Sequence, residues 1–155
     1  MRGLETIIRD HPLFKDLRDA TIKYIAECGT NVVFEAGTVI AREGEEANAF
    51  YLIRDGKVAI QVSTPNQGPV TLQTVGANDI IGWSWLFPPY LWCYDIKAIK
   101  KTRVIALDGR CLRNKCEKDH DLGYRLMKRF SQLIAHRLQA TRMQVLDVYN
   151  PSARS

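Results

Sequence analysis

The sequence has no long apolar run and no cluster of metal-binding residues. No hydrophobic stretch approaches the ~20 residues that a membrane-spanning helix needs, and the N-terminus lacks the basic-then-apolar layout of a signal peptide. We therefore expect a cytoplasmic protein that makes no contact with a membrane. The 4 cysteines form no Cys-x-x-Cys pair and the 3 histidines are scattered, so we expect neither a structural zinc site nor a disulfide framework.

Motifs of catalysis are also absent. The sequence contains no Gly-x-Ser-x-Gly motif, no Gly-Lys-Ser/Thr phosphate loop and no paired-histidine metal motif. Cys93 lies between Trp92 and Tyr94, where apolar surroundings would raise the pKa of its thiol and give the side chain a packing role. We therefore expect a binding protein and not an enzyme.

The length of 155 residues, 46% of them hydrophobic, suits one domain with a single buried core. We expect this domain to span residues 1–155. Its parts are short helices in residues 1–30, a β-roll in residues 31–108 and further helices in residues 109–149. The N-terminal helices follow from apolar spacings of three and four residues, which Pro12 interrupts.

The middle of the chain, residues 31–108, is predicted to form β-strands. It is rich in β-branched residues and in closely spaced turn signals such as Asp55-Gly56. Alternating apolar residues flank a Pro/Gly-rich tip and predict a hairpin with one buried face. They are Val58, Ile60 and Val62 on one side and Val70, Leu72 and Thr74 on the other. Many short strands joined by tight turns predict a mainly β fold, a jelly-roll β-barrel with flanking helices.

Residues 121–149 contain no proline and predict a long C-terminal helix with two apolar stripes. The first stripe is Leu122, Leu126, Phe130 and Leu133, and the second is Ile134, Leu138, Thr141, Val145 and Val148. The first suits packing against the domain, and the second has the spacing of a two-stranded coiled coil. We expect a homodimer through about residues 134–148. The alternative is a monomer whose long helix is buried on its own barrel.

Basic charge gathers in the C-terminal third. Residues 97–142 carry 13 Lys/Arg against 4 Asp/Glu, whereas the whole chain has a formal net charge of +5. Such asymmetry favours an anionic partner, such as nucleic acid, a phosphorylated ligand or an acidic protein face. More often, however, basic residues on a helical region are only its solvated face.

The run from Phe34 to Val58 carries a longer pattern. It consists of an aromatic residue and Gly37, an apolar strand, Glu43-Gly44, a Phe-Tyr-apolar-Ile strand and the turn residue Gly56. This pattern resembles the first half of cyclic-nucleotide-binding domains. The resemblance implies a jelly roll that turns sharply at these glycines, and it continues into the last helix.

The last helix resembles the ligand-binding half of the catabolite-activator regulators. There, Arg137-Leu138-Gln139-Ala140-Thr141 is similar to the part of the dimer helix whose threonine meets the nucleotide base and whose arginine lies near the ligand. In those regulators a winged helix-turn-helix follows, whereas this sequence stops at Ser155. We therefore expect no sequence-specific DNA binding.

The family's phosphate cassette corresponds to residues 82–98. In the family a glutamate binds the ribose and an arginine pairs with the phosphate, but here Trp83 and Trp92 stand at these positions. Each charge-assisted hydrogen bond contributes about 1.5–3 kcal/mol, so we expect no tight binding of cAMP or cGMP in the usual pose. The candidate ligand-binding residues are Gly82, Trp83, Ser84, Trp85, Leu86, Trp92, Cys93, Tyr94, Arg137 and Thr141.

Aromatic residues concentrate in this cassette, where residues 83–94 hold 6 of the 14 aromatics. They could form a pocket for a small ligand, either a cyclic nucleotide (cAMP or cGMP) or another planar or phosphorylated compound. Alternatively, they could fill the cavity with their own rings or anchor a protein partner. Our first hypothesis is a stand-alone regulatory module, in which a ligand shifts the dimer helix and a partner protein receives the signal. The alternative is a ligandless module of the same fold. It would bind a protein, or it would bind a polyanion such as nucleic acid without sequence specificity.

Overall fold

The computed structural model describes residues 3–149, and for residues 144–149 it describes the backbone alone. The N-terminal elements are α1 (Leu4–Asp10), the 3-10 helix η1 (Pro12–Phe14) and α2 (Asp19–Ala26). Eight strands follow in the described part of the chain: β1 (Gly29–Phe34), β2 (Val39–Ala41), β3 (Ala49–Asp55), β4 (Lys57–Thr64), β5 (Gly68–Gly76), β6 (Ile80–Ile81), β7 (Asp95–Ala98) and β8 (Thr102–Asp108). Two helices end the fold: α3 (Gly109–Lys118) and α4 (His120–Tyr149).

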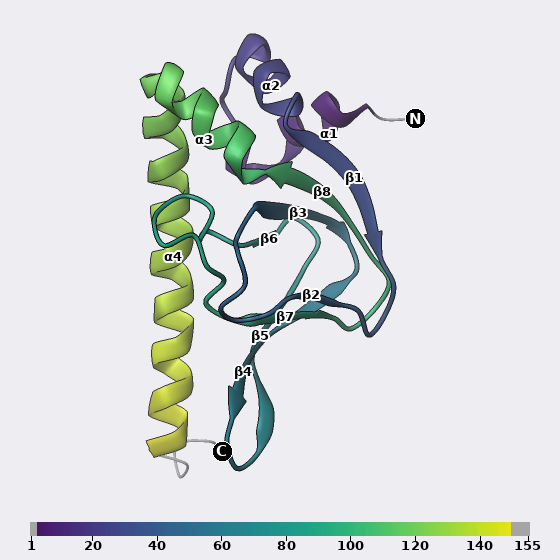
Figure 1. Cartoon of the computed structure of the whole chain (residues 1–155), viewed down its shortest axis with the longest axis vertical. Helices are drawn as coiled ribbons and strands as arrows, with labels where there is room; N and C mark the ends of the chain where they lie inside the picture. The colour runs from purple at the N-terminus through teal and green to yellow at the C-terminus, as the bar shows by residue number, and fades with distance from the viewer. Residues whose placement is uncertain (1–2, 150–155) are drawn as a thin grey trace.

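The strands form two antiparallel four-stranded sheets in the described residues. One has the order β1-β8-β3-β6 and the other β2-β7-β4-β5. This arrangement confirms the predicted jelly roll with helices on its flanks (Figure 1). The predicted hairpin is β4–β5, in which Val62 faces Val70 and Lys57 faces Gly76.

Turn glycines permit the close approach of neighbouring strands. Gly56, between β3 and β4, has a φ of +112°, in the left-handed region where a Cβ is strained. A Cβ there would also come within 2.6 Å of Thr102 Cα. The sharp turn that the sequence pattern predicts at Gly56 therefore requires glycine.

Two clusters of buried side chains form the core. One lies between the N-terminal helices, β3, β8 and α4, and the other fills the space between the two sheets. Leu122, Leu126 and Phe130 of the first α4 stripe are fully buried in the first cluster, which confirms that this stripe packs on the domain. These contacts of its N-terminal half hold helix α4 against the barrel.

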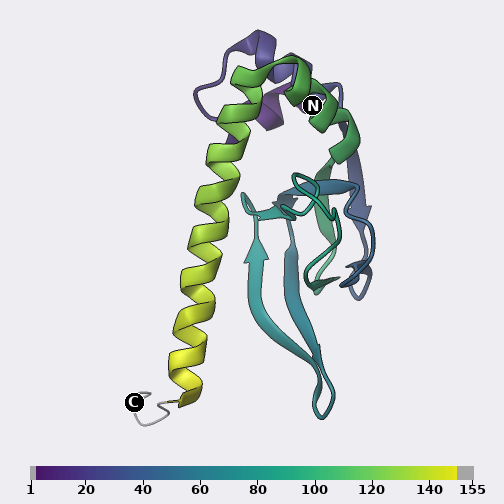
Figure 2. The same cartoon turned by 60° about the vertical axis from the view of Figure 1, so that its left-hand side comes forward.

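The rest of α4 runs alongside the β4–β5 hairpin, as both views show (Figure 2). Here the second stripe begins, and Leu138 keeps 68% of its surface exposed. A monomer whose long helix is fully buried on its own barrel would require Leu138 to be buried, and its exposure does not fit that alternative. The side chains of Val145 and Val148 lie outside the described residues, and so does the end of the predicted dimer seam.

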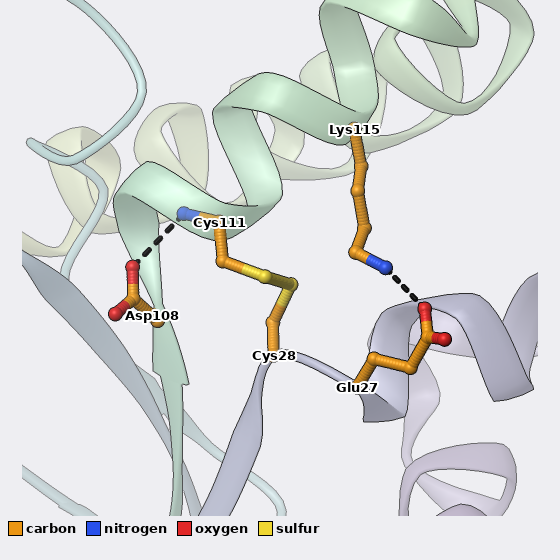
Figure 3. The surroundings of a disulfide bond; sticks show 5 residues. All are labelled: Glu27, Cys28, Asp108, Cys111 and Lys115. Carbon is orange, nitrogen blue, oxygen red and sulfur yellow. Dashed lines mark hydrogen bonds and ion pairs between the residues drawn. A yellow bond between two sulfur atoms is a disulfide. The ribbon is translucent and has the colours of Figure 1, made fainter.

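A disulfide joins Cys28 to Cys111, contrary to the expectation that the cysteines form no disulfide framework (Figure 3). The two cysteines are 83 residues apart in sequence. The pairing of β1 with β8 brings them together, because Asp108 N donates to Cys28 O at 2.9 Å and the Asp108 carboxylate caps Cys111 N at 2.9 Å. Such a long-range contact leaves no mark in local cysteine spacing.

An ion pair between Lys115 and Glu27 crosses the same junction, and the Lys115 ammonium lies 3.7 Å from the centroid of the Tyr24 ring. Together with the disulfide these contacts hold α3 to the end of α2. In residues 3–149, no helix is long and apolar enough to cross a membrane.

Candidate functional site

A cavity of about 150 Å³ lies between the β4–β5 hairpin and α4. Both elements and the loop after β6 contribute to its wall. The lining residues are Ile60, Leu72, Gln73, Trp83, Tyr94, Ile134, Arg137, Leu138 and Thr141. The cavity therefore joins the β-roll to the second half of the long helix.

The hairpin wall is shaped by an irregularity in its ladder. The register shifts between Ile60, which faces Gln73, and Gln61, which faces Thr71. Leu72 is consequently the extra residue of a bulge, and bulges re-aim side chains next to binding sites. Ile60, Leu72 and Gln73 all line the cavity as a result.

Arg137 is the only charged residue among the described residues that line this cavity. Its Nη2 group donates to the carbonyl of Ile80, and its guanidinium carbon lies 5.5 Å from the centroid of the Trp83 ring. Burial lowers the pKa of the Arg137 guanidinium, whereas the charges of Asp79 and Tyr94 act in the opposite direction. No carboxylate in the described part of the chain forms an ion pair with it, so a partly buried cation faces the cavity.

Trp83 and Tyr94 form the aromatic wall. Their ring centroids are 6.0 Å apart with an interplanar angle of 80°, an edge-to-face contact that fixes both rings. Thr141, one turn beyond Arg137 on α4, donates its hydroxyl to Arg137 O at 3.0 Å. The site thus combines one cation, two aromatic rings and short polar groups.

Beyond Trp83 the space narrows to about 10 Å³, beside Gly82, Ser84, Trp92 and Cys93. This is the region that the family resemblance assigns to the phosphate. The Trp92 ring closes it: a Cβ on Gly82, whose φ is +97°, would come within 2.8 Å of Trp92 Cη2. A volume of this size holds about one water molecule, so this end has no room for a phosphate.

The predicted site residues fall into three groups. Trp83, Tyr94, Arg137 and Thr141 line the open cavity, whereas Gly82, Ser84, Trp92 and Cys93 surround the closed end. The prediction that Trp85 and Leu86 bind the ligand was wrong, because Trp85 belongs to the first core cluster and Leu86 packs against it.

Trp85 is fully buried, stacked on Phe50 at 4.9 Å and edge-on to Phe130 at 5.4 Å. Trp83, by contrast, is only partly buried: it packs against the edge of this cluster and lines the cavity. Cys93 is a second correction. Its side chain is exposed, with Sγ 3.5 Å from the buried Ser84 hydroxyl, so the predicted packing role is wrong.

Sequence reasoning missed several wall residues. Ile60 and Leu72 were visible only as members of the alternating hairpin pattern, and Ile134 and Leu138 only as members of the second α4 stripe. Gln73 carried no signal, because its position in the wall depends on the bulge.

The fold agrees with comparison to known proteins. The model of the cyclic nucleotide-binding domain family matches residues 31–119, and the chain belongs to this family.

One similar crystal structure, of a protein from Geobacter metallireducens GS-15 named for the same family, has a TM-score of 0.78 and 30% identity, and covers 89% of this chain and 99% of that one. The CRP-like cAMP-activated global transcriptional regulator of Mycobacterium tuberculosis is 23% identical over 94% of this chain. A Rhodopseudomonas palustris relative, named as a potassium channel protein, is 30% identical over 66% of this chain.

These curated relatives are longer proteins. The matched part spans 63% of the length of the Mycobacterium regulator and 24% of the Rhodopseudomonas protein.

Proposed function

We propose that the chain is a regulatory ligand-binding module and that its ligand occupies the cavity between the β4–β5 hairpin and α4. The observation that carries this proposal is the position of Arg137 on the wall of a cavity. The charge of Asp79 acts on its partly buried guanidinium, which forms no ion pair among the described residues. A buried charge favours an oppositely charged group beside it. Membership of a family of nucleotide-binding domains supports the proposal, and no catalytic role is part of it.

The cavity suits regulation because its wall spans two elements. A ligand would contact Gln73 on β5 together with Arg137 and Thr141 on α4. It would therefore favour the packing of α4 in which both sets of contacts form, and a ligand shifts an equilibrium only by such a difference in affinity.

A homodimer is part of the same proposal. Ile134 and Leu138 line the cavity and also belong to the second α4 stripe, and 68% of Leu138 is exposed. A second copy that covers this stripe would sense the occupied cavity directly. The signal would then pass to a partner protein.

The ligand differs from cAMP or cGMP in the usual pose. Trp83 and Trp92 stand where the family places its two polar anchors, and the space beside Trp92 measures about 10 Å³. A compact ligand in the larger cavity is therefore the better fit.

Thermal unfolding of the purified chain tests the proposal against a panel of cyclic nucleotides, other nucleotides and small organic acids. A ligand at 100 times its dissociation constant stabilises the folded state by about 2.7 kcal/mol. We expect one class of compound to raise the Tm of the wild type and not that of Arg137→Gln. A panel without any stabilising compound, or equal stabilisation of both proteins, would refute ligand regulation at this site.

The ligandless interaction module has one observation in its favour. Tyr124 and Met127 on α4 are 64% and 48% exposed beside Lys128, so the basic region also presents apolar surface. This function predicts strongly salt-dependent binding to polyanions such as heparin. The regulatory module predicts no such binding.

A further inference from the structure

The size of the cavity limits the ligand. Small-molecule pockets usually measure about 300–1,000 Å³, whereas this cavity measures about 150 Å³ and the adjoining space about 10 Å³. A cavity of about 150 Å³ holds one benzene-sized ring. The enclosed part of the site therefore suits a ligand with one ring better than a base with a sugar and a phosphate.

The wall of the cavity favours an aromatic ring. Ile60 and Leu72 come from the hairpin, Ile134 comes from α4, and the indole of Trp83 lies across from them. Apolar side chains and one aromatic face provide stacking and burial for a flat ring. They offer little to a sugar, whose hydroxyls would need polar partners.

Among the described residues that line the cavity, only Arg137 carries a charge. The Nη2 group of Arg137 donates to Ile80 O, and its Nε and Nη1 groups have no hydrogen bond to any residue in the described part of the chain. A guanidinium binds a planar carboxylate through two parallel N–H groups. The free donors of Arg137 therefore suit a carboxylate on the ring.

We propose that the site binds a monocyclic aromatic carboxylate, with the ring against Trp83 and the carboxylate paired with Arg137. This inference rests on the proposed function and names the class of its ligand. The ring fills the space between the hairpin and α4, and the ion pair adds a contact from α4 that a neutral ring does not make. An aromatic acid thereby stabilises one position of α4.

Isothermal titration calorimetry of the full chain tests this class with four probes: benzoate, benzamide, cyclohexanecarboxylate and cAMP. Benzamide keeps the ring and removes the charge, whereas cyclohexanecarboxylate keeps the charge and removes the flat ring. We expect saturable binding of benzoate, with benzamide weaker by about 10- to 150-fold, the range for loss of a charge-assisted hydrogen bond. Cyclohexanecarboxylate should bind more weakly than benzoate as well.

Two matched variants locate the ion pair. Arg137→Gln should weaken benzoate by the same factor, whereas Arg142→Gln, at an exposed position of the same helix, should leave it unchanged. Equal affinity for benzoate and benzamide in the wild type would overturn the ion pair without any variant. Binding of cAMP but not benzoate would overturn the ligand class and the exclusion of cyclic nucleotides, and it would leave ligand regulation at this site standing. Failure of all four probes would overturn the ligand class, and failure of the wider panel as well would overturn the proposed function.

Discussion

Removal of the Cys28–Cys111 disulfide should destabilise the fold strongly. The bond closes a loop with a sequence separation of 83 residues. In the chain-entropy description, a loop of this length restricts the unfolded chain by about 4.5 kcal/mol. For a domain of this size each kcal/mol corresponds to about 2–4 °C in Tm, so a shift of about 9–18 °C is expected. The Lys115–Glu27 ion pair crosses the same junction but is partly solvent-exposed, and such pairs contribute at most about 1 kcal/mol.

Urea unfolding measures this effect, with tryptophan emission as the signal. The oxidised wild type is compared with the Cys28→Ala/Cys111→Ala variant, and Cys93→Ala/Cys116→Ala serves as the control because these two thiols are free. The double variant of the disulfide should unfold at a clearly lower urea concentration, whereas the control should unfold close to the wild type. Equal midpoints for the wild type and the disulfide variant, or four free thiols in the native protein, would refute the reasoning.

Three further predictions follow from buried groups. Trp85→Ala should lower the free energy of unfolding by about 3–5 kcal/mol, because it empties a fully buried site between Phe50 and Phe130. Phe87→Ala, in the same loop but 40% exposed, should cost about 0.5 kcal/mol or less, and equal losses would contradict the placement of Trp85. A thiol reagent at pH 8 should modify the exposed Cys93 rapidly and Cys116 slowly, since burial raises the pKa of the Cys116 thiol to about 11; two equally fast thiols would count against this difference. Burial lowers the pKa of His11 below its usual 6.5, so the unfolded chain binds the extra proton and stability should fall as the pH drops below about 6.5. Urea midpoints between pH 7.5 and pH 5 should show a smaller fall in His11→Gln, and an unchanged fall would rule out this histidine as its source.

The sequence predicted the elements whose pattern repeats along the chain. Alternation at Val58, Ile60 and Val62 indicated a hairpin strand, and Leu122, Leu126 and Phe130 indicated the buried face of the long helix. Both predictions are confirmed, because the period of a strand or a helix decides which side chains face the core.

The cassette loop has no such period, and its residues could not be placed in advance. Three tryptophans within ten residues lie in three places: Trp85 in the first core cluster, Trp92 in the second, and Trp83 at the cavity. The loop conformation decides among them, and neither composition nor spacing reports it. Contacts between distant segments were equally hidden, as Cys28 and Cys111 illustrate.

We infer that the site beside α4 takes a compact ligand and that the Trp92 ring closes the space to which the family resemblance assigns the phosphate. Calorimetric titration of the purified chain with cAMP tests it most directly. We expect no saturable binding below the millimolar range, because the family resemblance puts Trp83 and Trp92 in place of two polar anchors that would contribute about 1.5–3 kcal/mol each. A dissociation constant in the micromolar range, lost in Arg137→Gln and kept in Arg142→Gln, would contradict the claim and return the site to ordinary nucleotide binding.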